Sequence, residues 1–231
     1  MIEIIPAIMP QSYSDLEEKM RQVSSLSDFV QIDIMDGVFT PSRSWPYPLS
    51  NNPEFEEIKD GKKDMPFLND LEFEVDLMVS EPQIDSEDWI KSGARRVIVH
   101  FASTKNILGV IEQIRKSSPD VSSPLAIECG LAVSAETDFD DISSLVSSVD
   151  FVQCMGISKI GYQGQPFDDK ILSLISRLRN RYPELIISVD GGVSLETAPE
   201  LIRLGVNRLV VGSAIFQSDN IEETIQSFQS L

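Results

Sequence analysis

The feature that most constrains the fold is an alternation, repeated along the whole chain, between short strand-like apolar runs and longer amphipathic segments with helical spacing. Eight runs are predicted as strands, namely 2–8, 29–35, 73–79, 96–101, 124–129, 150–155, 185–190 and 208–213. Helices placed between successive strands require those strands to run parallel, because each helix returns the chain to the same end of the sheet. Eight strand–helix units favour a closed (β/α)₈ TIM barrel, with an open doubly wound sheet as the alternative.

The length fits a single barrel. The chain has 231 residues, and a (β/α)₈ domain takes roughly 250, so we expect one domain over 1–231. Residues 40–70 depart from the alternation, with five prolines and one short helical stretch near 53–60. This extended loop follows the second strand, and it is either a lid over the site or a tolerated insertion. A lid would contact substrate through Arg43, Trp45 and Tyr47.

Charge and composition exclude several classes of partner. The net charge of −18 argues against nucleic acid and anionic membranes as partners. No apolar run approaches the ~20 residues of a membrane helix. The first residues, MIEIIPAIMP, lack a basic segment, so we expect no signal peptide and a cytoplasmic protein. The two cysteines, Cys129 and Cys154, fall in predicted strands and are expected to be buried free thiols.

Acidic side chains stand near the ends of several predicted strands, where a barrel places its active site. Asp33, Asp76 and Asp190 occupy inward positions on the second, third and seventh strands. Like charges in a confined site cost stability unless a proton, a cation or a substrate offsets them. Three such acids therefore indicate a functional cluster, although isolated acids at strand ends are often helix caps or ion-pair partners. The predicted bounds also place Glu128 near the end of the fifth strand.

Glycine-containing turns follow the last three predicted strands. They are GYQGQ (161–165), DGGVS (190–194) and GSAIF (212–216). Backbone N–H groups in such turns hold phosphate without a basic side chain, and barrels commonly bind phosphate after strands seven and eight. The turns predict a site that binds phosphate despite the negative net charge of the protein. The alternative is that they are ordinary turns with no ligand.

The motifs, taken in order, resemble the ribulose-phosphate 3-epimerase family, whose fold is a TIM barrel of the ribulose-phosphate-binding type. The resemblance runs over nearly the full chain. It rests on IPAI (5–8), DIMDGVFTP (33–41), DLM (76–78), VH (99–100), VQCM (152–155), GYQGQPF (161–167), VDGGV (189–193) and VGSAIF (211–216).

The resemblance implies an isomerase of pentose phosphate metabolism that epimerises a sugar phosphate at the carbon next to a ketone. Asp33 and Asp190 would be the two acid/bases, with a divalent metal stabilising the enediolate between them. The implied substrate pocket comprises Met35, Met78, Met155 and His100, although a core histidine is the alternative for His100. The implied phosphate-binding residues are Gly164, Gly191, Gly192, Gly212 and Ser213.

The chain departs from the family pattern at the metal. The family has histidines where this chain has Gln31 and Asp76, and a serine where it has Ala7. An asparagine expected late in the fifth strand is loosely matched by Glu128. Loss of both imidazoles disfavours Zn²⁺ and Fe²⁺. The remaining oxygen donors suit Mg²⁺, Mn²⁺ or Ca²⁺; they are Gln31, Asp33, Asp76 and Asp190. The site could instead work without metal, or be inactive.

Three functions follow as hypotheses. The first is a sugar-phosphate epimerase. The second is a phosphosugar lyase of the same barrel group, but those relatives carry an Asp-x-Lys-x-x-Asp pattern and here Met35 takes the lysine's place. The third is a non-catalytic sugar-phosphate binder. Barrels of this kind often form homo-oligomers, and nothing in the sequence indicates an interface.

Overall fold

Eight parallel strands close into a barrel in the computed structural model, which describes residues 2–47, 52–118, 123 and 126–231. Each strand pairs with the next in the chain, and β8 pairs with β1. The strands are β1 Glu3–Ile8, β2 Phe29–Met35, β3 Glu72–Met78, β4 Arg96–His100, β5 Glu128–Val133, β6 Phe151–Met155, β7 Ile186–Asp190 and β8 Arg208–Val211. The predicted (β/α)₈ TIM barrel is confirmed.

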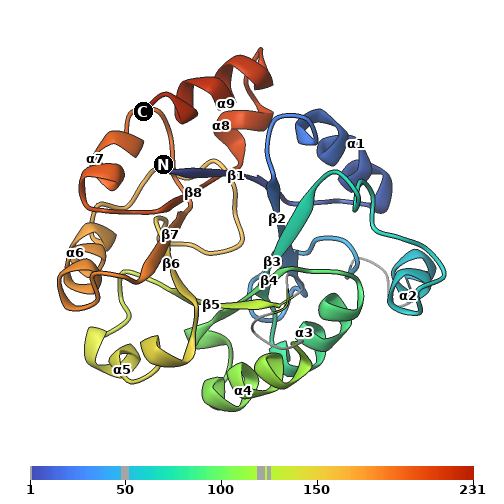
Figure 1. The fold of residues 1–231 in the computed structure, drawn as a ribbon, viewed down its shortest axis with the longest axis horizontal. Coiled ribbons are helices and arrows are strands. Elements are labelled where there is room, and N and C mark those ends of the chain that lie inside the picture. Colours follow the sequence, from blue (N-terminus) through green and yellow to red (C-terminus); the bar gives the residue numbers. More distant parts are fainter. Residues whose placement is uncertain (1, 48–51, 119–122, 124–125) are drawn as a thin grey trace.

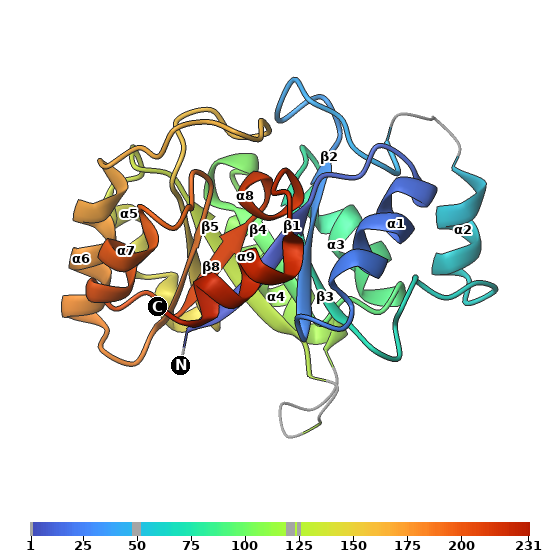
Figure 2. The ribbon, with the colours of Figure 1, turned by 90° about the horizontal axis from the view of Figure 1, so that it is seen from above.

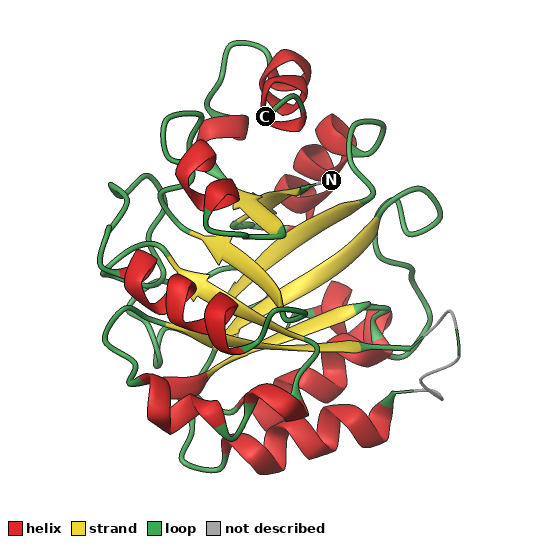
Figure 3. Ribbon diagram, turned by 60° about the vertical axis from the view of Figure 1, so that its left-hand side comes forward, coloured by secondary structure: helices red, strands yellow, loops and turns green. Residues whose placement is uncertain are grey.

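A ring of helices surrounds the barrel (Figure 1). The helices are α1 Tyr13–Val23, α2 Pro53–Lys59, α3 Pro82–Lys91, α4 Ile107–Ser117, α5 Phe139–Ser143, α6 Ile171–Arg181, α7 Ala198–Arg203, α8 Ser213–Phe216 and α9 Ile221–Gln229, with 3₁₀ turns η1 Phe101–Ser103 and η2 Val146–Ser148. Figure 3 shows this outer helical layer around the strands. Within the described part of the chain, no helix combines the length and the apolar character needed to span a bilayer.

The first helix illustrates why these segments are helical. Ser12 accepts a hydrogen bond from the backbone N–H of Asp15, so it caps the helix start. Leu16, Met20 and Val23 recur at helical spacing and are all fully buried. This stripe packs on the barrel, and fully burying an aliphatic side chain stabilises the fold by about 1.5–3 kcal/mol.

Side chains alternate along each strand between the helix layer and the barrel interior. On β2, Ile32 and Ile34 belong to the large apolar core that lies between strands and helices. The intervening side chains of β2 point into the barrel, where Gln31 and Asp33 reach partners on other strands. Both cysteines are free and buried, as expected, and they pack in the outer apolar core.

The fifth strand corrects one prediction. The expected run 124–129, of which residues 124 and 125 lie outside the described part, is displaced in the structure to β5 Glu128–Val133. Glu128 therefore starts the strand and lies at the end of the barrel opposite the site, 2.9 Å from Arg208. The interior needs a glycine here, since a Cβ on Gly130 would lie 2.4 Å from Cζ of Phe151. A short apolar run gives little information on where a strand begins and ends.

The buried polar layer around Glu128 closes the N-terminal end of the barrel. Two arginines, Arg96 and Arg208, are nearly buried and form ion pairs with Glu3, Glu74 and Glu128. Burial raises the pKa of Glu74 to about 7, against the opposing effect of the positive charge of Arg96. This layer is a structural plug, and the C-terminal mouth carries the functional candidates.

The loop after β2 folds back onto the barrel. Trp45, expected as a contact residue of a lid, is instead 2% exposed and packs against Phe55 and Trp89, with ring centroids 5.4 and 5.9 Å away. Ser44 donates a hydrogen bond to the carbonyl of Asp33 and accepts one from the N–H of Met35. The expected short helix is α2, whereas residues 48–51 lie outside the described part. The loop thus braces the end of β2, and Figure 2 shows its tip on the same face as the loop after β6.

Candidate active site

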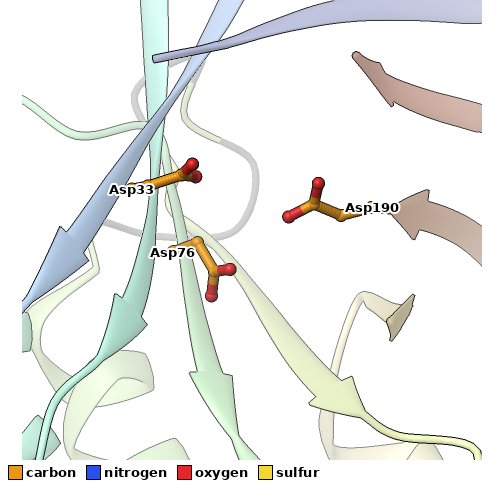
Figure 4. A group of neighbouring side chains, drawn as sticks. All are labelled: Asp33, Asp76 and Asp190. Atoms are coloured by element: carbon orange, nitrogen blue, oxygen red, sulfur yellow. The ribbon is translucent and has the colours of Figure 1, made fainter. Parts of the chain in front are cut away.

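Three aspartates meet at the C-terminal mouth of the barrel. Asp33 on β2 lies beside Asp76 on β3 in the strand register, and Asp190 is the last residue of β7. One carboxylate oxygen from each lies within 4.8 Å of the others. Figure 4 shows Asp190 facing Asp33 and Asp76 across the mouth. The structure thus brings together the three acids that were predicted to share a site, and this triad could hold a divalent metal ion.

Gln31 lies between two of these acids. Its Nε2 donates to Oδ1 of Asp33 at 2.9 Å and to Oδ2 of Asp190 at 3.0 Å. The side chain is fully buried, and its Oε1 has no hydrogen-bond partner within the part of the chain that the structure describes. One amide therefore joins two carboxylates that are far apart in the sequence, while its own acceptor stays unpaired.

The third acid has different partners. His100 Nε2 lies 2.9 Å from Oδ1 of Asp76, and both side chains are buried. Nε2 of Gln153 approaches Oδ2 of Asp76 at 3.5 Å, and Ser188 donates to Oε1 of Gln153 at 3.3 Å. His100 thus orients the carboxylate of Asp76 through a buried hydrogen bond.

Burial and mutual repulsion shift the titration of the acids. Burial, followed by the negative charge of Asp76, raises the pKa of Asp190 to about 7, against the lowering effects of Gln31 and His100. Burial, followed by the charges of Asp190 and Asp76, raises the pKa of Asp33 well above its ordinary value. The cluster therefore keeps a proton near neutral pH. An ionised carboxylate beside a protonated one supplies a base and an acid in one site.

A cavity beside the acids gathers two of the four predicted pocket residues, Met78 and Met155, and all five predicted phosphate-binding residues. It is lined by Ala7, Met9, Asp33, Met78, Met155, Ile157, Gly161, Tyr162, Gln163, Gly164, Gln165, Asp190, Gly191, Gly192, Val193, Val210, Gly212 and Ser213. Met35 and His100 do not line it; they are buried, at 0% and 2% exposure. Tyr162 and Gln163 belong to the predicted turn 161–165, whereas sequence reasoning missed Met9. Met9 follows the end of β1, so its position at a strand end was a usable signal.

The turn after β7 requires glycine. Gly191 and Gly192 have φ values of +97° and +68°, a backbone region that favours glycine. A Cβ on Gly192 would lie 2.6 Å from Cα of Phe167, so the two chain segments touch here. Gly212 precedes the short helix α8, whose first N–H groups have no partner within the helix. Gly212 and Ser213 line the same cavity as Asp33 and Asp190.

The protein is thus a TIM barrel in which aspartates and glycine turns line one cavity at the C-terminal mouth. The sequence model of the ribulose-phosphate 3-epimerase family matches residues 3–216. The chain belongs to this family.

Curated relatives span nearly its whole length. Ribulose-phosphate 3-epimerase of Bacillus subtilis is 29% identical over 226 residues, covering 95% of this chain and 94% of that protein. The enzyme of the same name from Eremothecium gossypii is 26% identical over 230 residues, covering 96% and 89%.

Solved structures share the fold. KGPDC from Streptococcus mutans superposes with a TM-score of 0.71 at 13% identity, covering 99% of this chain and 96% of that one. A 3-hexulose-6-phosphate synthase gives a TM-score of 0.67 at 17% identity, covering 99% of both chains. At these identities the likeness concerns the barrel alone.

Proposed function

We propose that this protein is a sugar-phosphate epimerase that inverts the carbon next to the ketone of a pentulose 5-phosphate, with Asp33 and Asp190 as its two acid/bases. One observation carries the proposal. The buried carboxylate of Asp33 and the half-buried carboxylate of Asp190 face each other across the mouth, and a single amide NH₂ group of Gln31 bonds both of them. Stereoinversion needs a proton acceptor on one face of a planar intermediate and a proton donor on the other.

The proton balance is simple. The ionised aspartate removes the proton from C3, and the electron pair of the broken C–H bond moves toward the C2 carbonyl oxygen, giving an enediolate. The opposite aspartate, which is protonated, then gives its proton to the other face of C3. The raised pKa values of Asp33 and Asp190 support this division, because they favour one bound proton at neutral pH. The two carboxyls exchange roles in the reverse direction.

The glycine turns support phosphate as the remote anchor of the substrate. Gly164, the turn at Gly191 and Gly192, and the start of α8 line the same cavity as the two aspartates. No lysine or arginine is among the described residues that line it, so backbone N–H groups and neutral side chains such as Ser213 are the donors offered to an anion. Phosphate binding by such uncharged donors is compatible with a net charge of −18.

A divalent ion, when bound by Asp33, Asp76 and Asp190, would supply positive charge to the developing enediolate oxygens. Asp76 and its partner His100 then serve to shape the site, since neither lies across the mouth from Asp33 as Asp190 does. Inactivity or non-catalytic binding is the competing outcome of the experiment below.

Proton exchange with solvent tests the proposal. In D₂O with a divalent metal, NMR should show deuterium entering C3 of ribulose 5-phosphate as xylulose 5-phosphate forms. Asp33→Asn and Asp190→Asn should each slow epimerisation by about 10²–10⁴-fold, the usual share of a general acid or base. Asp28→Asn is the matched control, since Asp28 is exposed and precedes β2 at the other end of the barrel.

Three results would count against the proposal. Exchange that is unchanged in both site variants would remove the two aspartates from the mechanism. Saturable binding of the phosphosugar with no exchange under any divalent metal would identify a non-catalytic binder. Cleavage of a carbon–carbon bond in place of epimerisation would identify a lyase.

A further inference from the structure

We propose that Gln31 and Asp76 make this mouth an all-oxygen cation site selective for Mg²⁺ or Mn²⁺, in which Oε1 of Gln31 joins Asp33, Asp76 and Asp190 as a ligand. The inference deepens the proposed function, and it rests on that function only for what the cation does during the reaction. Cation binding itself depends on the residues described above and can be measured without substrate.

The first argument is the chemistry of the available donors. Each of the three carboxylates offers an oxygen to one small volume, and hard oxygen donors suit Mg²⁺ and Mn²⁺. The thiols and the imidazole of the chain are engaged elsewhere. Both cysteines pack into the outer apolar core, and Nε2 of the one histidine, His100, is hydrogen-bonded to Asp76. When that nitrogen is the donor of this hydrogen bond, it has no lone pair for a metal.

The second argument is the unpaired oxygen of Gln31. A primary amide carries its donor nitrogen and its acceptor oxygen in nearly the same shape, so a half-turn of the amide exchanges them. The position of Nε2 lies 2.9 and 3.0 Å from oxygens of Asp33 and Asp190. Ligand oxygens around an octahedral Mg²⁺, at about 2.1 Å from the ion, lie about 3.0 Å apart along each edge.

If the amide oxygen of Gln31 took the position of Nε2, it would lie next to oxygens of Asp33 and Asp190. All three oxygens are hydrogen-bond acceptors that repel one another, so a cation would be needed between them. In its present place Oε1 is fully buried without a partner among the described residues, which is an unfavourable arrangement for an acceptor. Gln31 is therefore a buried side chain whose amide group reaches the acidic cluster and whose oxygen is unpaired among the described residues. The distances from the Nε2 position to the two carboxylate oxygens match the distance between neighbouring ligand oxygens around a small octahedral ion.

The third argument is the support behind Asp76. Carboxylates that bind metals are themselves held by hydrogen bonds from a second layer of side chains. His100 binds one oxygen of Asp76 at 2.9 Å, while the contact of Gln153 with the other oxygen is long, at 3.5 Å. This arrangement orients Asp76 and leaves lone pairs on its oxygens. His100 is thus a positioning residue for the site.

Manganese binding tests the inference directly. The purified protein is treated with EDTA, desalted and titrated with MnCl₂, and free Mn²⁺ is followed by its electron paramagnetic resonance signal. We expect one Mn²⁺ per chain, displaced by excess Mg²⁺. Gln31→Leu should weaken Mn²⁺ binding roughly tenfold or more, and Gln31→Glu, which keeps an oxygen donor, should bind at least as tightly as the wild type. Gln113→Leu is the matched control, because Gln113 lies on α4 and bonds the carbonyl of Gln83.

Metal selectivity gives a second readout. Restoring both imidazoles in Gln31→His/Asp76→His should raise the ratio of Zn²⁺ affinity to Mn²⁺ affinity roughly tenfold or more, since imidazole suits Zn²⁺ better than it suits Mn²⁺. The ratio is compared within each protein, because most sites bind Zn²⁺ more tightly than Mn²⁺. Circular dichroism checks that each variant is folded. If Gln31→Leu does not fold, Gln31→Glu and the double variant Gln31→His/Asp76→His still test the inference.

Clear results would overturn the inference. One is a folded wild-type protein that leaves Mn²⁺ entirely free at millimolar concentration, which would mean that the Gln31 NH₂ group permanently bridges the acids. Another is Mn²⁺ affinity that is the same in Gln31→Leu and the wild type. Mn²⁺ binding without C3 exchange would leave this inference standing while the proposed epimerase failed. Full C3 exchange by a protein that binds no Mn²⁺ in the titration would do the reverse.

Discussion

Gln31 uses its one amide nitrogen to bond Asp33, two residues away on its own strand, and Asp190, on the far side of the mouth. Any proton chemistry at this site depends on how these carboxyls share protons. Both have raised pKa values, chiefly because they are buried. A raised pKa keeps the proton on a carboxyl at a pH where an exposed aspartate is already ionised.

The pH dependence of C3 exchange follows from this shift. As the pH falls below the pKa of about 7 for Asp190, with the pKa of Asp33 raised as well, the fraction of ionised base shrinks, so exchange should fall by up to about tenfold per pH unit between pH 7 and pH 5. At high pH both are ionised and the acid is lost, so the rate should fall again. A rate profile measured by NMR in D₂O checks this. A flat rate from pH 5 to pH 7 would show that the base has an ordinary carboxyl pKa.

At the scale of elements, the loop after β2 shows that an irregular segment can belong to the core. Its tryptophan, Trp45, completes an aromatic cluster with Phe55 of α2 and Trp89 of α3. The loop therefore ties two helices to the end of the strand that carries Asp33. A proline-rich segment of this length in a compact domain needs such an anchor, because its backbone gains no ladder of hydrogen bonds.

Replacing the anchor should cost stability rather than substrate affinity. Trp45→Ala should lower the free energy of unfolding by about 3–5 kcal/mol, the range for deleting a buried tryptophan, as measured by urea titration. Arg43→Ala is the control from the same loop; Arg43 is exposed, so its loss should change the free energy by less than about 0.5 kcal/mol. A raised KM with unchanged unfolding in Trp45→Ala would instead support a lid.

The fit between β5 and β6 gives a second test at this scale. A methyl group on Gly130 would overlap the ring of Phe151, so Gly130→Ala should destabilise the barrel by about 1–3 kcal/mol through overpacking. Phe151→Leu frees space at the same point, and the double variant should lose less stability than the two single losses added together. Additive losses in urea unfolding would mean that the two positions do not compete for space.

The whole molecule carries a strong negative field around its site. A charge of −18 repels a doubly charged phosphate at long range, while the proposed grip uses backbone groups at short range. The two effects respond differently to salt, because screening weakens interactions over distance more than it weakens buried contacts. The net charge therefore influences encounter more than the bound state.

Salt should therefore help this protein bind its substrate. Raising the ionic strength from about 10 mM to about 150 mM shortens the Debye length from roughly 30 to 8 Å, so KM for the sugar phosphate should fall. Steady-state kinetics at constant metal concentration measure the effect, with the binding of the unphosphorylated pentulose as the control that salt should leave unchanged. A KM that rises with salt would indicate a grip made by lysine or arginine side chains.

Much of the fold could be predicted from the sequence because its signals are local. Seven of the eight strands lie within about two residues of their predicted bounds, since apolar alternation and flanking turn residues are properties of short segments. Asp33, Asp76 and Asp190 were identified because parallel strands place their C-terminal ends on one face. The same argument located the five phosphate candidates, which line one cavity in the structure.

The features that the sequence did not predict depend on long-range packing. The start of β5 depends on pairing with β4 and on the ring of Phe151 inside the barrel, and Trp45 is buried by helices remote from it in sequence. The sequence by itself determined a barrel of eight units and the strands that carry its acids. Only the tertiary structure decided that Gln31 lies between Asp33 and Asp190 and that His100 holds Asp76, because those contacts exist only once strand register closes the ring.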